Sequence, residues 1–204
     1  RYACNTIFTP EIRSEMRFKQ PEELTVDECK FIGFWIADGG KYPRKNNGTN
    51  FRLSQSPSYP HIVKWIEDLL KKIGVDSIRK LRKQSYKSKD CHLLTWHMSR
   101  GTGGGEQFRK GLFHLEPYLE KNGTPLFWAL NEAQFDALVE GYWYGDGAHG
   151  SAENGMPKHI HMQDTKKPWI ELLCSIGPVR GWKCTMSHVK IEKQNCLDQW
   201  RIGM

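Results

Sequence analysis

The sequence lacks several features that mark common classes of protein. Its six cysteines are scattered, and no two of them have the close spacing that zinc ligands usually show. No apolar run approaches the length of a membrane span, and the N-terminal residues do not form a signal peptide. The glycine-rich segment RGTGGGE (100–106) lacks the Lys-Ser or Lys-Thr pair that a P-loop requires. We therefore expect an intracellular protein with reduced thiols, cytoplasmic or nucleoid-associated, and no membrane partner.

Positive charge, by contrast, is present in excess. The chain contains 204 residues, of which 38% are hydrophobic and 26% charged, as is typical of a folded protein with a sizeable core. Its net charge of +7 favours an anionic partner, and nucleic acid is the first candidate. Because the chain begins with Arg1 rather than methionine, we expect it to be part of a longer polypeptide.

One motif occurs twice, as FIGFWIADG (31–39) and VEGYWYGDG (139–147). Its glycine, tryptophan and aspartate recur at a spacing of 108 residues, and a later glutamine shares that spacing: Gly33 and Gly141, Trp35 and Trp143, Asp38 and Asp146, Gln55 and Gln163. Each copy continues into a segment of helical periodicity that ends near Ile-Gly, over 62–74 and 169–177. The sequence therefore predicts two copies of one structural unit.

Local signals predict the order of elements in each unit. Capping boxes at Thr25 and Asn131 open two motif helices, which end at the Asp-Gly pairs, with Gly39 and Gly147 expected at positive φ. Two short strands, the helical segment and a second strand pair then follow. The second pairs are expected at about 77–83 with 91–98 and at about 179–186 with 197–202. A further helix over 106–119 completes the first unit.

The predicted fold class is α+β, built from tandem αββαββα repeats related by a pseudo-two-fold axis. We expect a lead-in over residues 1–23, a first repeat over 24–120, a linker over 121–130 and a second repeat over 131–204. The second repeat ends at Met204, before its last helix begins.

Small residues mark one face of each motif helix. Gly33 and Ala37 are four residues apart, as are Gly141 and Gly145, so each pair lies on a single helical face. Faces of this kind let two helix backbones approach closely. We expect the two helices to pair through these four residues and to bring Asp38 and Asp146 side by side.

Two neighbouring carboxylates repel each other, and a cation relieves the repulsion. Mg²⁺ commonly takes one or two protein carboxylates and leaves its other positions to water and phosphate oxygens. The sequence therefore predicts a metal site at Asp38 and Asp146. The alternative is that each Asp-Gly pair forms a simple turn.

At this point the two motifs resemble the paired LAGLIDADG motifs of homing endonucleases. The match lies in the third-position glycine, the acid and the final glycine, and the repeat extends it over nearly the whole chain. The resemblance implies a saddle of antiparallel sheets over DNA and Mg²⁺ or Mn²⁺ bound by Asp38 and Asp146. We include Ala37 and Gly145, which precede the acids, in the expected metal site. It also implies a monomer that cuts a long, asymmetric double-stranded target.

The resemblance also suggests supporting catalytic residues. Gln55 matches a polar position that borders the active site, and Gln163 is its counterpart at the repeat spacing. Strand parity opposes the second assignment, because Phe51 and Leu53 alternate inward with Gln55, whereas Ile160 and Met162 do not alternate with Gln163. Lys121 matches a lysine that assists near the scissile phosphate. Its alternative reading is an ordinary solvated lysine of the linker.

Basic residues concentrate on the predicted strand pairs, where the resemblance implies contact with DNA. Lysine mostly neutralises phosphates, while arginine on a strand can read base edges. The candidates in the first repeat are Lys41, Arg44, Lys45, Arg52, Arg79, Lys80, Arg82 and Lys83. Those in the second repeat are Lys158, His159, His161, Lys166, Lys167, Arg180, Lys183 and Arg201. Each one alone is compatible with a solvated surface charge.

The expected function is therefore a Mg²⁺-dependent, site-specific double-strand DNA endonuclease, a hydrolase that uses two aspartates. The alternative is a protein of the same fold that lacks nuclease activity, either an RNA maturase or a DNA-binding regulator. The segment of 121–125 resembles the endonuclease blocks of inteins, but no splicing cysteine block or terminal His-Asn pair is present. Free-standing, intron-encoded and intein-encoded forms remain open, as does the target sequence.

Overall fold

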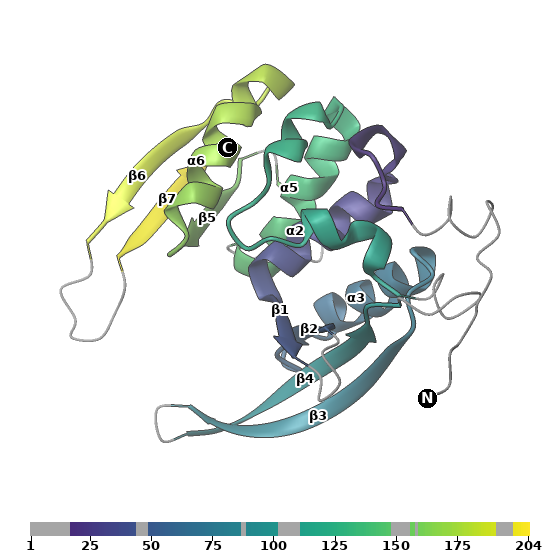
Figure 1. Ribbon diagram of the computed structural model, residues 1–204. Coiled ribbons are helices and arrows are strands. Elements are labelled where there is room, and N and C mark those ends of the chain that lie inside the picture. Colours follow the sequence, from purple (N-terminus) through teal and green to yellow (C-terminus); the bar gives the residue numbers. More distant parts are fainter. Residues whose placement is uncertain are drawn as a thin grey trace.

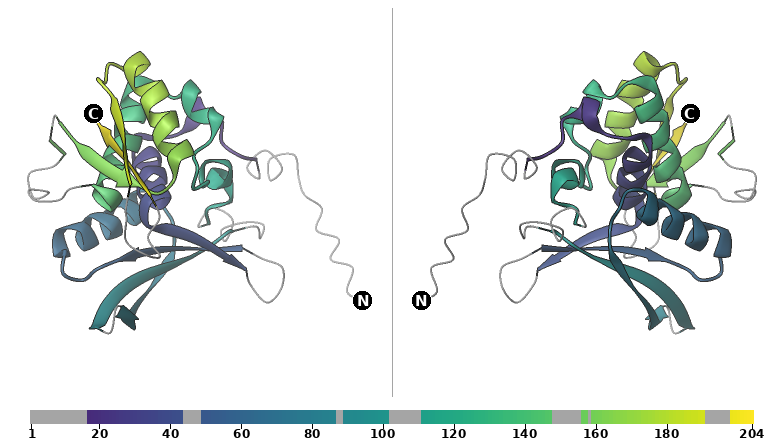
Figure 2. Two further views of the ribbon diagram at one scale, coloured as in Figure 1. Left: turned by 90° about the vertical axis from the view of Figure 1, so that its left-hand side faces the viewer. Right: turned by 90° about the vertical axis from the view of Figure 1, so that its right-hand side faces the viewer.

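The computed structural model describes residues 17–43, 49–86, 89–101, 111–147, 156–157, 159–190 and 198–204. Two antiparallel sheets and two central helices dominate the architecture, which confirms the predicted α+β class. The central helices lie between the sheets, and each sheet carries one further helix (Figures 1 and 2). None of the described helices is long and apolar enough to cross a membrane.

The two motif helices begin where their capping boxes predict. Helix α2 spans Val26–Asp38 and helix α5 spans Glu132–Asp146. The Thr25 hydroxyl accepts a bond from the Glu28 amide at 3.1 Å, and the Glu28 carboxylate accepts one from the Thr25 amide at 2.9 Å. The Asn131 side chain and Gln134 exchange the same two bonds at 3.0 and 2.9 Å. The capping boxes therefore satisfy amide groups that a helix start leaves without partners.

The glycines that follow the helices have a different role from the one expected. Gly39 and Gly147 have φ values of −84° and −83°, so the prediction of positive φ is wrong. A Cβ on Gly39 would lie 2.4 Å from Cδ1 of Trp35, and one on Gly147 would lie 2.2 Å from Cδ1 of Trp143. Glycine is needed at both positions because an indole ring packs directly against the backbone.

The helix pair is in backbone contact, as the small residues predict. A Cβ on Gly33 would lie 2.0 Å from the Leu138 carbonyl oxygen, and one on Gly141 would lie 1.9 Å from the Lys30 carbonyl oxygen. A Cβ on Gly145 would lie 2.2 Å from Cβ of Ala37. No larger side chain fits at these glycines without separating the helices.

The first sheet has the strand order β1-β2-β4-β3. Its strands are β1 (Gly39–Pro43), β2 (Thr49–Gln55), β3 (Ser77–Tyr86) and β4 (Lys89–Ser99). Helix α3 (Pro60–Lys72) connects β2 to β3 and buries Ile62, Ile66, Leu69 and Leu70. Phe51 and Leu53 of β2 are buried, so one face of this sheet belongs to the core. The predicted second strand pair is confirmed and is longer than expected.

The second sheet has the order β5-β7-β6. Its strands are β5 (His161–Asp164), β6 (Thr185–Val189) and β7 (Gln199–Gly203), and helix α6 (Lys167–Ile176) packs against it. Gly147 adds one isolated bridge to Met162. The strand expected from residue 179 begins at Thr185 instead, because Gly177–Arg180 forms a 3-10 helix, η5.

Three other 3-10 helices complete the described structure. They are η1 (Pro21–Glu23), η2 (Phe113–Tyr118) and η3 (Pro125–Ala129). The predicted helix over 106–119 is replaced in its described part by η2, which contains Pro117. Proline has no amide hydrogen to continue an α-helical ladder. The remainder of that prediction lies outside the described residues.

Candidate active site

Asp38 and Asp146 end the two central helices and lie next to each other. Oδ2 of Asp38 is 3.6 Å from the place where a Cβ on Gly145 would stand, so it sits against the end of α5. Burial and the charge of Asp146 raise the pKa of Asp38 to about 7. Burial and the charge of Asp164 raise the pKa of Asp146 to about 6. The helices therefore bring together carboxylates that resist ionisation, as expected from their spacing.

Lys121 lies at the end of α2 and not in a solvated linker. Its ammonium donates to the carbonyl oxygens of Trp35, Ile36 and Ala37 at 2.9, 2.7 and 2.9 Å. Burial and the charge of Lys166 lower the pKa of Lys121 to about 8. A cation at a helix C-terminus complements the helix dipole. The Ala37 carbonyl, which was predicted to belong to the metal site, thus accepts a hydrogen bond from Lys121.

Gln55 reaches the same site from the end of β2. Its side-chain nitrogen is 3.5 Å from Oδ2 of Asp38, and its oxygen accepts from the Ser56 amide at 2.6 Å. The second bond fixes which end of the amide faces the acid. Gln55 is therefore placed to donate to Asp38.

Gln163 is not the structural counterpart of Gln55. In the first sheet Gly39 pairs with Leu53, whereas in the second the bridge joins Gly147 to Met162. The repeat spacing is thus 109 residues at this strand, one more than in the helices. Asp164 of the second repeat therefore occupies the position that corresponds to Gln55 in the first. Gln163 lies on the exposed face, where its oxygen accepts from Arg201 at 3.2 Å.

Asp164 is a site residue that sequence reasoning missed. It is 7% exposed and accepts bonds from the Tyr142 hydroxyl at 2.7 Å and from the Lys166 amide at 3.0 Å. The Lys166 ammonium also bonds its carboxylate. Burial opposes its ionisation, but these bonds outweigh burial and lower its pKa. The parity mismatch at Ile160 and Met162 was the signal that could have found it.

A hollow of about 300 Å³ opens beside Asp146 on the exposed face of the second sheet. It is lined by Asp146, Gly147, His161, Met162, Gln163 and Arg201. Gln163 therefore borders the site, although from the outer side. An arginine and a carboxylate around one hollow suit a phosphate group accompanied by a cation.

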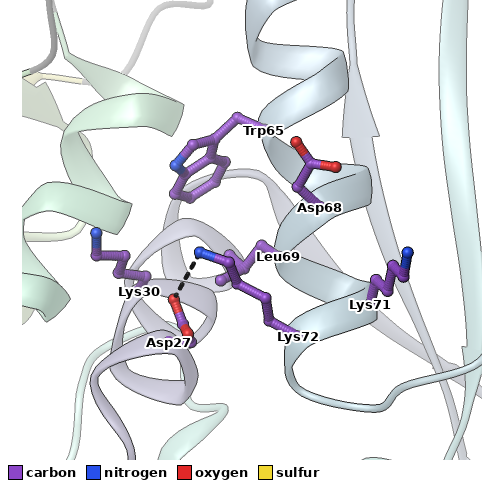
Figure 3. Close-up of a pocket in the computed structure, with 7 residues that line it drawn as sticks. All are labelled: Asp27, Lys30, Trp65, Asp68, Leu69, Lys71 and Lys72. Atoms are coloured by element: carbon purple, nitrogen blue, oxygen red, sulfur yellow. Dashed lines mark ion pairs between the residues drawn. The ribbon is translucent and has the colours of Figure 1, made fainter.

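A second hollow, of about 520 Å³, opens between α2 and α3 (Figure 3). Lys72 reaches toward Asp27 across it, and their charged atoms are 3.7 Å apart. Asp27 lies in the first turn of α2, whereas Asp38 ends this helix. None of the predicted site residues lines this hollow.

Pairing in the first sheet separates its basic residues onto two faces. Residues directly opposite on antiparallel strands share a face, so Arg52 lies with His97, Lys80 with Thr95 and Arg82 with Leu93. This face, turned away from α2 and α3, is called the outer face below. Lys41, Arg79 and Lys83 occupy the opposite face. There Arg79 pairs with Glu67 of α3 at 2.6 Å and Lys41 with Glu120 at 2.6 Å.

The second sheet brings fewer of the predicted residues to its outer face. His161 and Arg201 lie there with Gln163. Arg180 belongs to η5 and donates to the Trp128 carbonyl oxygen at 2.8 Å, so its prediction as a strand residue is wrong. Lys167 pairs with Glu171 at 2.9 Å. His159 and Lys183 are exposed outside the strands, and Arg44, Lys45 and Lys158 lie outside the described residues.

The described residues contain no group of three or more His, Cys, Asp or Glu side chains arranged to hold a metal. Among side chains of these types, a metal at the helix ends would rely on the carboxylates of Asp38 and Asp146, while the inclusion of Ala37 and Gly145 stays a prediction. Mg²⁺ accepts such a set, since water and phosphate oxygens complete its octahedron. The raised pKa values of both acids are consistent with a site that favours a cation.

Comparisons with known proteins find similarity to solved structures only. No protein-family model matches the chain, and no curated protein matches it. A solved structure of the homing endonuclease I-WcaI bound to its DNA recognition sequence is similar to the chain, with 12% sequence identity and a TM-score of 0.49. The likeness covers 95% of this chain and 82% of the other.

Proposed function

We propose that the chain is a metal-dependent, site-specific endonuclease of the LAGLIDADG type that hydrolyses both strands of a DNA target. One observation carries the proposal. Glycine contacts between α2 and α5 bring Asp38 and Asp146 together at the helix ends, between the two sheets. A simple turn at each Asp-Gly pair would not require this backbone contact. The acids, rather than a nucleophilic side chain, are the groups suited to the reaction.

In this proposal Asp38 and Asp146 hold Mg²⁺ or Mn²⁺. A divalent metal in such a site activates water and stabilises charge on the leaving oxygen of a phosphodiester. Gln55 orients Asp38 by donating to its carboxylate. Lys121 and Lys166 place positive charge beside both acids, which lowers the cost of keeping them ionised.

The outer faces of the two sheets are the proposed DNA-binding surfaces. Arg52, Lys80 and Arg82 supply the first, and His161 and Arg201 supply the second. The hollow beside Arg201 on the second surface includes Asp146, and β1 of the first sheet begins directly after Asp38. A duplex lying across both sheets would place its phosphates over the paired acids.

Selection from a library of long randomised duplexes tests this function. The purified chain is incubated with Mg²⁺, and cut ends are captured and sequenced; Ca²⁺ in place of Mg²⁺ gives the sites that are bound without cutting. We expect one asymmetric sequence in both pools, with breaks on both strands only with Mg²⁺. A DNA-binding regulator would enrich duplexes without breaks, and a maturase would prefer structured RNA. Either result would contradict the proposal.

A further inference from the structure

Strand β3 carries two exposed aliphatic side chains, one on each face of the first sheet. Ile78 is 65% exposed and Leu81 is 61% exposed. Ile78 lies opposite His97 of β4, and His97 lies opposite Arg52 of β2, so these three side chains share the outer face. Leu81 lies opposite Leu94, which packs against the core on the other face. Of the two aliphatic residues, Ile78 therefore belongs to the proposed DNA-binding surface.

The arginines of the outer face have contacts of their own. Arg82 donates from its guanidinium to Nε2 of His97 at 3.5 Å, because a guanidinium has no acceptor. The guanidinium carbon of Arg52 lies 5.8 Å from the centre of the Tyr42 ring on β1. These contacts are made with His97 and Tyr42, and Ile78 remains exposed beside them.

Strands β3 and β4 form a long two-stranded ribbon at the edge of the sheet (Figure 1). A ribbon of two strands fits the major groove of B-DNA. Lys80 and Arg82 follow Ile78 at alternate positions of β3, so all three side chains project from one face of the ribbon. DNA that contacts the two basic residues would therefore also meet Ile78.

An exposed isoleucine among cations suits one feature of a duplex. Arg52, Lys80 and Arg82 can bind phosphates and the acceptors of guanine. The apolar group in the major groove is the C5 methyl group of thymine. Contact between this methyl group and Ile78 removes two apolar surfaces from water. A polar base edge placed against Ile78 would instead lose its hydrogen bonds with water.

We propose that Ile78 is a specificity-determining residue that contacts the methyl group of a thymine at one position of the DNA target. The inference rests on the proposed function, since it needs DNA on the outer face. It adds a base preference to that function, because the basic residues around Ile78 do not favour a methyl group.

Replacement of thymine by deoxyuridine tests the contact, because it removes the methyl group and keeps the base pair. Each thymine of the selected target is replaced in turn, and affinity is measured with Ca²⁺. In the wild-type chain, one replacement should weaken binding about fourfold, as expected for one methyl group returned to water. In Ile78→Ala, the same replacement should have no effect. The other thymines should behave as they do in the wild-type chain.

Leu81→Ala is the matched control, since it removes a similarly exposed aliphatic side chain from the other face of the same strand. It should keep the wild-type response to every replacement. The inference alone would be overturned by a wild-type chain that tolerates all replacements, or by Ile78→Ala with the wild-type response. Loss of the response in both variants would also contradict it. A wild-type chain that enriches no sequence would overturn both the inference and the proposed function.

Discussion

Asp38 and Asp146 show how neighbouring groups set the properties of a single side chain. Both end helices with the same sequence pattern, yet Asp38 adjoins an amide, Gln55, while Asp146 adjoins a third carboxylate, Asp164. The sequence predicted the acids and Gln55, because their spacing repeats. The constant spacing of 108 residues led to Gln163 instead of Asp164, because one extra residue before β5 shifts the strand by one position and exchanges its two faces; the parity of Ile160 and Met162 was the sequence signal of this shift.

The first prediction concerns the two acids. Asp38→Asn and Asp146→Asn should each reduce double-strand cleavage by about a thousandfold or more, because a bound metal supplies several kcal/mol of transition-state stabilisation. DNA binding should stay within about threefold, since removing a negative charge does not weaken contact with phosphates. Cleavage of the selected duplex with Mg²⁺ and binding with Ca²⁺ measure the two effects. Full cleavage by either variant would refute the site assignment.

The second prediction concerns the stability of the metal-free chain. The folded pKa of Asp38, about 7, lies above its ordinary value of 3.8, so ionisation destabilises the fold as the pH rises through this interval. Asp38→Asn removes that cost, and at pH 8 the variant should melt about 3 °C or more above the wild type. At pH 3.5 the difference should vanish. Thermal unfolding with a chelator present checks this, and an equal difference at both pH values would contradict it.

At the scale of elements, the central helix pair was the most predictable part of the fold. Capping boxes fixed its start, and small residues on one face fixed how the helices meet. The conformation of Gly39 was predicted wrongly, since an Asp-Gly ending is compatible with a turn as well as with a direct entry into a strand. The contact with Trp35 that decides between them depends on tertiary packing, which local sequence does not reveal.

The third prediction tests the helix contact. Gly33→Ala should lower the free energy of unfolding by about 3 kcal/mol or more, because its Cβ would lie 2.0 Å from the Leu138 carbonyl oxygen and backbone cannot yield cheaply. Gly40→Ala is the control, since its Cβ would meet nothing within 4 Å. Chemical denaturation of both variants measures the difference. Equal stability of the two would show that the helices are not in backbone contact.

At the scale of the whole molecule, the distribution of charge follows from how the strands pair. The basic residues of the first sheet were predicted to contact DNA as one group. Composition does not distinguish the two faces of a strand when both faces carry lysine and arginine. The observed pairing places Arg52 and Arg82 on the outer face. It places Arg79 on the opposite face, where its side chain pairs with Glu67 of α3. The net charge of the chain does not distinguish these three arginines from one another.

The fourth prediction uses this division. Arg52→Ala and Arg82→Ala should each weaken DNA binding and reduce the slope of log affinity against log salt by about 0.9, the effect of one lost phosphate contact. Arg79→Ala should leave the slope unchanged, because this side chain is held by Glu67 on the opposite face. Titrations of a fixed duplex at several salt concentrations measure the slopes. Equal slopes for all three variants would contradict the assignment of the outer face.

The one-residue difference between the helix spacing of 108 and the spacing of 109 at β5 affects the chemistry of the candidate site. The shift makes the two halves of the candidate site chemically unequal: Asp38 adjoins the amide of Gln55, whereas Asp146 adjoins the ion pair of Asp164 and Lys166. If the chain cuts as proposed, its two nicks form at unequal rates, and a singly nicked duplex accumulates before the break is complete. A palindromic target would then suit neither half as well as an asymmetric one.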